Sequence, residues 1–298
     1  MKLAILAVLA ALGCGKAEEK FEPKEPLPPI MQRYSDAVQR LYDMLDNGWV
    51  VARGQDNKPF DEGDSLIFTG IATHALPCDY DTPLAKSFPN GQLFRHPSQP
   101  KTVSLDGALG FYIGLASRLK RCQGNENYVE TFKKHFEYSV ANGDKINEGS
   151  DAKVEKEFTY IRDLLAFKLG LRAQPSSDRL ALLESQIALW ARAVTLSKSA
   201  CYRIHLGWLS FKTIELLDGS ISKGGRDSFC VGGLGAGLPI VEHWCGRDDL
   251  VSWIDGFKFD EWGYRHQRCD RWEQPDGNGR RQPGVDYLVA IREAYKLP

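Results

Sequence analysis

Charged side chains stand at or near the starts of several apolar segments of this chain. Asp64 comes just before one such segment, Asp106 opens the next, and Asp163 lies near the start of a third. Arg203 and His205 open a fourth. Carboxylates that apolar surroundings partly remove from water can have their pKa values pushed apart, so that one donates a proton while another acts as base or nucleophile. Cleavage of a glycosidic bond uses such a pair, and we expect Asp64 and Asp106 to form it. Asp163 and His205 are the expected supporting groups.

These charged groups also have structural explanations. An acidic residue at a helix start caps backbone N–H groups and complements the helix dipole, which is enough to explain Asp64. Asp106 and Asp163 lie inside apolar sequence, where an unpaired carboxylate is costly. Arg162 and Arg203 are available to pair with them or to bind substrate. A buried network of ion pairs therefore competes with catalysis as an explanation.

Residues 253–283 form an irregular segment in which aromatic and charged residues are interleaved. Sugar rings pack their C–H faces on aromatic side chains while their hydroxyl groups form hydrogen bonds with polar neighbours. Trp262, Tyr264 and Trp272 are therefore predicted to bind substrate. The alternative is a lid that folds over the helices with its aromatic rings buried.

The hydrophobic pattern predicts a chain made mainly of helices. Between residues 30 and 45, apolar residues recur at helical spacing with polar residues between them, so one face of this segment is buried and the other is wet. Apolar and small residues instead cover nearly every face of residues 66–76, as in a helix that is buried all round. Strand-like alternation is found at residues 49–52. The two helical patterns recur, with buried helices expected at 104–119, 158–171, 203–217 and 229–241 and amphipathic helices at 128–140 and 180–196.

Alternating buried and amphipathic helices are what two concentric layers of helices require. In this respect residues 30–298 resemble an (α/α) barrel or toroid, a fold of many glycoside hydrolases, polysaccharide lyases and terpenoid enzymes. We count about ten helices, fewer than a full ring of hairpins has, so the resemblance implies an all-α fold of layered helical hairpins in an incomplete ring. It also implies a glycoside hydrolase or a polysaccharide lyase, without choosing between hydrolysis and elimination. A simple layered helical bundle is the alternative.

The N-terminal segment has the pattern of an export signal. Lys2 is followed by an apolar run that ends at Gly13 and Cys14 and is too short to span a bilayer. With Cys14 in this position, the segment resembles a bacterial lipoprotein signal with its lipobox, although Ala11 stands where Leu is favoured. The resemblance implies cleavage before Cys14, anchoring through acyl chains such as palmitate on that residue, and a place in the cell envelope. Because Gly15 follows the cysteine, the outer membrane is preferred. An ordinary signal peptide is the alternative.

The chain thus divides into three predicted parts. Residues 1–13 are a signal peptide, and residues 14–29 are a lipidated cysteine with a flexible tether rich in proline and charge. Residues 30–298 form a single helical domain.

Composition narrows the expected partners and cofactors. The net charge is −1 and no dense block of Lys and Arg is present, so nucleic acid is not expected as a partner. We expect the membrane, through the lipid anchor, and a polysaccharide or another envelope protein. The chain has seven cysteines, and the even number left after Cys14 predicts disulfide bonds whose connectivity stays open. No cofactor or metal is expected, the alternative being a metal site of Cys230, His243 and Cys245.

Two hypotheses about function follow. The first is an exported, lipid-anchored protein that binds a carbohydrate and cleaves it by carboxylate acid/base chemistry. The second is a non-catalytic envelope lipoprotein that acts as a scaffold or partner-binding module. Convergence of the acidic groups in an open cleft favours the first, and acidic groups that are scattered or fully paired favour the second.

Overall fold

The computed structural model describes residues 29–51, 53, 58–59, 65–80, 82–196, 201–234, 238–247, 250–256 and 285–297. The described chain is mainly helical, and the predicted all-α class is confirmed. Its helices are α2 (Pro29–Tyr42), α3 (Ser65–Ala75), the 3₁₀ helix η1 (Pro83–Ala85), α4 (Leu105–Arg121), α5 (Glu126–Ala141), α6 (Thr159–Lys168), α7 (Ser177–Leu196), α8 (Cys201–Leu216), α9 (Lys223–Gly233), α10 (Pro239–Trp244), α11 (Leu250–Gly256) and α12 (Val285–Tyr295). The short strands β1 (Leu45–Asp46) and β2 (Trp49–Val50) form an antiparallel hairpin, β2 falling in the segment with strand-like alternation. No helix in these ranges is long and apolar enough to cross a membrane.

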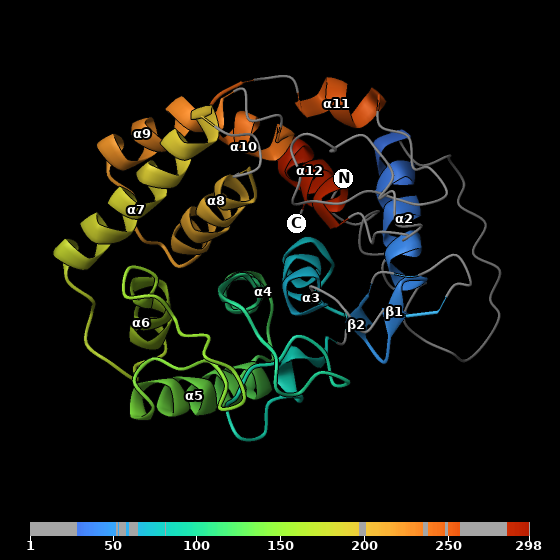
Figure 1. Ribbon diagram of the computed structural model, residues 1–298. Coiled ribbons are helices and arrows are strands. Elements are labelled where there is room, and N and C mark those ends of the chain that lie inside the picture. Colours follow the sequence, from blue (N-terminus) through green and yellow to red (C-terminus); the bar gives the residue numbers. More distant parts are fainter. Residues whose placement is uncertain are drawn as a thin grey trace.

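Helices α3 and α4 lie side by side in the middle of the molecule, seen end-on in Figure 1. All eleven residues of α3 are buried, as its sequence predicts. The two helices approach so closely because glycines face each other across the contact. A Cβ atom on Gly70 would lie 1.9 Å from the carbonyl oxygen of Gly110, and one on Gly110 would lie 2.4 Å from the Cα of Ile67. Close packing of this pair therefore depends on the absence of side chains at both glycines.

The other helices surround this central pair. Helix α12 packs on α3 and α8 packs on α4, while α2, α5, α7, α9 and α11 lie farther out (Figure 1). The outer helices bury one face, as their period predicts: α2 buries Tyr34, Ala37, Val38 and Leu41. The distinction between buried and amphipathic helices is therefore confirmed for α2, α3 and α4. The ring of the toroid stays a prediction.

The carboxyl end of α3 is held by arginines from two other helices. Carbonyl groups in the last turn of a helix have no partner within the helix. Arg121 of α4 donates hydrogen bonds to the carbonyl oxygens of Thr73, His74 and Leu76 at 3.0, 2.7 and 3.3 Å. Arg292 of α12 donates to the His74 carbonyl at 2.6 Å. The central helix is thus completed by side chains that are distant in sequence.

The prediction of one buried helix over residues 229–241 is wrong. Helix α9 ends at Gly233 and α10 begins at Pro239, which occupies the first helical position. Proline cannot donate a backbone hydrogen bond into a continuing helix, so it starts a new one. Within α9, Val231 is 71% exposed, whereas a Cβ on Gly232 would lie 2.0 Å from the Ala191 carbonyl oxygen of α7. The small residues therefore make one close face against α7, and the segment is not buried all round.

Two disulfide bonds join the described residues. Cys78, just after α3, bonds Cys122 at the end of α4, and Cys230 of α9 bonds Cys245 at the end of α10. The expectation that some cysteines pair is confirmed. Cys269 lies outside the described residues.

Candidate functional site

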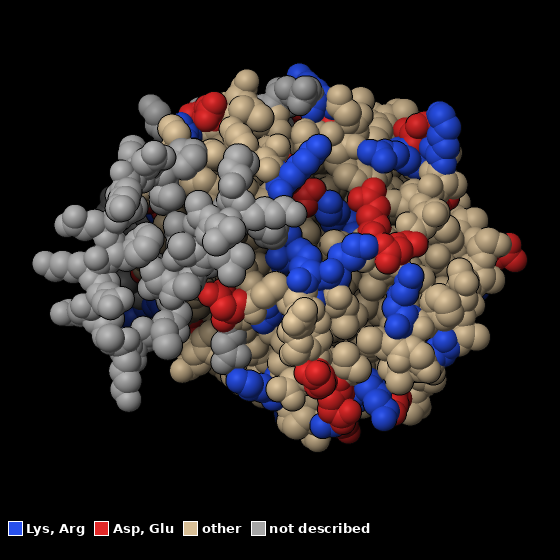
Figure 2. All heavy atoms as spheres, turned by 180° about the vertical axis from the view of Figure 1, so that it is seen from behind, with Lys and Arg blue, Asp and Glu red and all other residues tan. Residues whose placement is uncertain are grey.

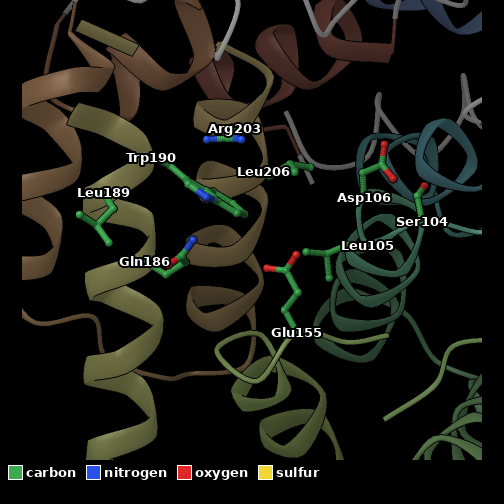
Figure 3. A pocket seen from close by; sticks show the side chains of 9 residues that line it. All are labelled: Ser104, Leu105, Asp106, Glu155, Gln186, Leu189, Trp190, Arg203 and Leu206. Carbon is green, nitrogen blue, oxygen red and sulfur yellow. The ribbon is translucent and has the colours of Figure 1, made fainter. Parts of the chain in front are cut away.

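A cavity of about 570 Å³ opens where several helices begin. It lies among the start of α4, the segment before α6, the middle of α7 and the first turn of α8 (Figure 3). Its walls are Ser104, Leu105, Asp106, Glu155, Gln186, Leu189, Trp190, Arg203 and Leu206. The predicted convergence of helix starts thus holds for α4 and α8, which bring Asp106 and Arg203 to one cavity.

Asp106 stands in the first turn of α4 and is partly exposed. Its Oδ1 accepts a hydrogen bond from the backbone N–H of Gly107 at 3.0 Å, and a negative charge here also complements the helix dipole. Ser104, at the N-cap position, forms no side-chain capping bond. The carboxylate of Asp106 therefore has hydrogen-bonding capacity left for a molecule in the cavity.

Glu155 is a cavity residue that the sequence analysis missed. It precedes α6, and its carboxylate is open to solvent at the cavity, on a different element from Asp106 (Figure 3). Partial removal from water raises the pKa of the Glu155 carboxyl; the charge of Glu157 raises it further, and Arg203 opposes the shift. Glu155 lies just before the predicted buried helix 158–171. The rule that singled out acidic groups at the starts of apolar segments would have found it.

His205 is the sequence neighbour of the cavity residue Leu206 and is 2% exposed. Burial lowers the pKa of His205 to about 4, and the charge of Asp106 acts against that shift. The ring stacks on Trp208 with 6.0 Å between centroids. At neutral pH the imidazole is therefore uncharged and electrostatically coupled to Asp106.

Asp163 does not line the cavity. It is fully buried, with Arg162 at 3.0 Å, Arg172 at 2.6 Å and Arg179 at 2.5 Å from its carboxylate oxygens. Arg162 also contacts Asp144 at 2.5 Å. The predicted catalytic role of Asp163 and the predicted substrate-binding role of Arg162 both conflict with this burial, since buried groups that pair with each other are out of reach of a substrate. The ion-pair explanation fits both residues.

Four predicted site residues lie outside the described residues. They are Asp64, which precedes α3, and Trp262, Tyr264 and Trp272 of the aromatic segment. The predicted pairing of Asp64 with Asp106 therefore stays a prediction, as does sugar binding by the three aromatic side chains. Cys14 also lies outside the described residues, and its lipidation stays a prediction.

Helix α7 supplies an aromatic wall to the cavity. Trp190 is 8% exposed and stacks on Phe158 with 5.0 Å between ring centroids. Gln186, one turn earlier, also faces the cavity (Figure 3). Because residues three and four apart share a helix face, one amphipathic helix contributes both an apolar and an amide surface here.

Four polar side chains of the cavity have hydrogen-bonding groups to spare, namely Ser104, Asp106, Glu155 and Gln186. Among the described residues, the side chains of Ser104, Glu155 and Gln186 form no hydrogen bond, and Asp106 accepts one from Gly107. Together they offer hydroxyl, amide and carboxylate groups from three elements. The arrangement suits a ligand with several hydroxyl groups.

The metal alternative for Cys230, His243 and Cys245 is wrong, because both cysteine sulfurs are joined to each other at 2.04 Å. A disulfide sulfur is no thiolate ligand. Over the part of the chain that the structure describes, no cluster of three or more His, Cys, Asp or Glu side chains is arranged to hold a metal ion.

Charges of both signs are intermixed on the surface. On the face in Figure 2, Lys and Arg side chains gather near the centre with Asp and Glu side chains directly beside them. Opposite charges this close reduce each other's field.

Comparisons of the chain with models of protein families, with curated proteins and with solved structures find no significant match in any of the three.

Proposed function

We propose that the protein binds a carbohydrate in the cavity between α4, α7 and α8 and cleaves it with Asp106 and Glu155. The observation that carries this proposal is the cavity's set of polar side chains with unused hydrogen-bonding capacity, which come from separate elements and surround about 570 Å³. Cavities of roughly 300–1,000 Å³ hold small organic ligands. Ser104 and Gln186 would bind hydroxyl groups, and Trp190 would contact a C–H face of a sugar ring.

The two carboxyl groups have different surroundings, which suits different roles. The pKa of Glu155 is raised, so Glu155 is the proposed general acid that protonates the leaving oxygen. Asp106 is the proposed base or nucleophile on the other side of the bond. After proton donation, the positive charge of Arg203 stabilises the Glu155 carboxylate. Asp64 is the alternative partner of Asp106, as the sequence predicts.

The test is binding and hydrolysis of an oligosaccharide panel, measured by ligand-observed NMR and by release of reducing ends. Asp106→Asn and Glu155→Gln keep the shape of each side chain and remove its charge, and we expect both to retain binding and to lower turnover by about 100-fold or more. Asp151→Asn is the matched control, since Asp151 is an exposed acid of the same segment and does not line the cavity. Turnover that survives both cavity variants contradicts the proposed chemistry. No binding of any saccharide contradicts the proposed ligand.

A non-catalytic envelope lipoprotein is the second candidate. The pairing of Asp163 with three arginines favours it, because this acid, which the sequence had suggested as a catalytic group, is part of a buried ion-pair network. On this proposal the cavity binds a partner or a glycan without cleaving it. Saccharide binding with no release of reducing ends at any pH is the result that supports it over the enzyme.

We also propose that the protein is exported and held at the cell envelope by acyl chains on Cys14. The support is the order of Lys2, apolar run and Gly13-Cys14 in the sequence. Intact-mass measurement of the purified protein should give a chain that begins at Cys14 and carries acyl groups. The variant Cys14→Ser should leave the membrane fraction, and a variant that stays there without acylation contradicts the anchor.

A further inference from the structure

Ser98, His96 and Asp46 lie next to one another, and none of them lines the cavity described above. Ser98 and His96 belong to the segment between η1 and α4, and Asp46 is in β1. The Ser98 Oγ is 2.8 Å from the His96 Nδ1, and the His96 Nε2 is 3.5 Å from an Asp46 carboxylate oxygen. A serine hydroxyl that is hydrogen-bonded to a histidine base, with a carboxylate close to the other ring nitrogen, is typical of activated serine residues.

The hydrogen bonds of the loop fix which ring nitrogen of His96 is the base. The backbone N–H of Ser98 donates to the His96 Nδ1 at 3.3 Å. A backbone amide only donates, so Nδ1 carries no proton and accepts also from the Ser98 hydroxyl. The ring proton of neutral His96 is then on Nε2, which faces Asp46. The unprotonated nitrogen therefore points at the serine, as general-base catalysis requires.

An exposed serine next to a buried histidine suits a reactive serine. Ser98 is exposed, His96 is 6% exposed, and the Asp46 side chain is 32% exposed. The ring of Trp49 meets the His96 ring edge to face, with 6.0 Å between centroids. Packing thus holds the base in place while the nucleophile stays open to molecules from solution.

We propose that Ser98 is a base-activated nucleophile that accepts an acyl group from an ester at the protein surface. In the acylation step the Ser98 Oγ forms a bond to the carbonyl carbon, and its proton moves to the His96 Nδ1. The bond between that carbon and the alcohol oxygen breaks, and the proton on His96 passes to the departing alcohol. Asp46 stabilises the imidazolium that forms between the two proton transfers. The products are O-acyl-Ser98 and a free alcohol.

A serine, a histidine and a glutamate lie together inside the protein and provide an internal comparison. The Ser117 Oγ is 3.0 Å from the His74 Nδ1, and the His74 Nε2 is 3.4 Å from Glu293. Ser117 is 0% exposed. Its Oγ accepts a hydrogen bond from the Arg121 Nε at 2.9 Å, which draws electron density away from the oxygen. An acyl donor in solution cannot reach Ser117, so the proposal assigns reactivity to Ser98 and none to Ser117.

The test uses a fluorophosphonate probe on the purified protein, with labelled peptides identified by mass spectrometry. We expect one label per chain, on Ser98, and none on Ser117. Ser98→Ala should abolish labelling, and Ser117→Ala, the matched control, should leave its rate unchanged. His96→Gln should slow labelling by about 100-fold and Asp46→Asn by about tenfold, each with an unchanged circular dichroism spectrum.

Each remaining outcome overturns the proposal. A chain that takes up no label at probe concentrations that label a control serine hydrolase shows that Ser98 is not activated. Labelling at several exposed serines, or at Ser98 at the same rate in His96→Gln and Asp46→Asn, shows that exposure alone explains the reaction. Because Asp46 is partly exposed, Asp46→Asn is the variant that keeps the test valid if His96→Gln does not fold.

Discussion

Gly70 and Gly110 touch backbone to backbone, and a Cβ atom on Gly70 would lie 1.9 Å from the carbonyl oxygen of Gly110. The contact lies between the two central helices, so it cannot be widened without moving the layers around it.

We expect Gly70→Ala to lower the free energy of unfolding by about 3 kcal/mol or to prevent folding, because the methyl group meets backbone atoms that have no room to shift. Gly224→Ala in α9 is the control, since nothing lies within 4 Å of a Cβ there. A helical glycine with open space should gain about 0.5–1 kcal/mol on replacement by alanine. Urea unfolding of both variants is the measurement, and equal stabilities would contradict the close contact.

Asp163→Asn should be strongly destabilising. The substitution leaves Arg162, Arg172 and Arg179 around a neutral amide, and removing one partner of a buried ion pair costs about 3–5 kcal/mol. Asp227→Asn provides the comparison, because the Lys223–Asp227 pair is 89% and 59% exposed and such pairs contribute about 0.5 kcal/mol or less. If thermal unfolding gives the two variants similar stabilities, the buried network does not stabilise the fold.

Reduction of the disulfide bonds should destabilise the protein unequally. The loop-closure estimate is about 4 kcal/mol for the Cys78–Cys122 bond, whose sequence separation is 44, and about 3 kcal/mol for Cys230–Cys245, with 15. Serine pairs at each bond, compared by guanidinium unfolding, test this order. The reverse order would mean that local packing around α9 and α10 outweighs the chain-entropy effect.

Stability should fall as the pH is lowered from about 6.5 to about 4. Burial lowers the pKa values of His74, His135 and His205 to about 4, below the ordinary histidine value of 6.5. In this window the unfolded chain binds protons that the folded chain does not, so acid favours unfolding by up to about 4 kcal/mol per pH unit for three sites. Urea midpoints measured between pH 7.5 and 4.5 test the slope. His205→Gln should reduce it by about a third, and a midpoint independent of pH would contradict the burial of these rings.

Glu293 adds a second loss of stability at lower pH. Burial of the carboxylate raises the pKa of Glu293, but His74 and Lys212 lower it by more, to about 2. A carboxyl group with a lowered pKa stabilises the fold above its ordinary pKa of 4.5, and this contribution disappears as the pH falls toward 2. In acid titrations of Glu293→Gln we expect a shallower loss below pH 4.5. The same loss in the variant and the parent would show that Glu293 does not titrate in this range.

Sequence patterns predicted the helices better than the site. The all-round apolar character of 66–76 and the one-sided pattern of 30–45 report local burial, which a single helix encodes by itself. They correspond to the fully buried α3 and to α2 with its one buried face. The prediction for residues 229–241 was wrong because small residues that pack one helix closely against a neighbour give the same sequence pattern as residues that are buried on all sides.

Partners of the site residues could not be predicted in the same way. Asp163 and Arg172 are nine positions apart and meet only because the chain turns after α6. From the sequence alone, several Lys and Arg residues are therefore equally good candidates for the partner of Asp163. Glu155 could be singled out as an acid just before an apolar segment, but its place at a cavity depends on α7 and α8, which supply other walls. Cavities are set by tertiary packing, and periodicity carries no information about them.

The arginine caps on α3 also bear on the order of events during synthesis. Arg292, which binds the His74 carbonyl, follows that residue by 218 positions and leaves the ribosome long after α3 has emerged. Until then the innermost helix lacks one of the donors at its carboxyl end. Folding to this structure therefore cannot finish before α12 has been made, so the last helix of the chain takes part in completing the innermost one.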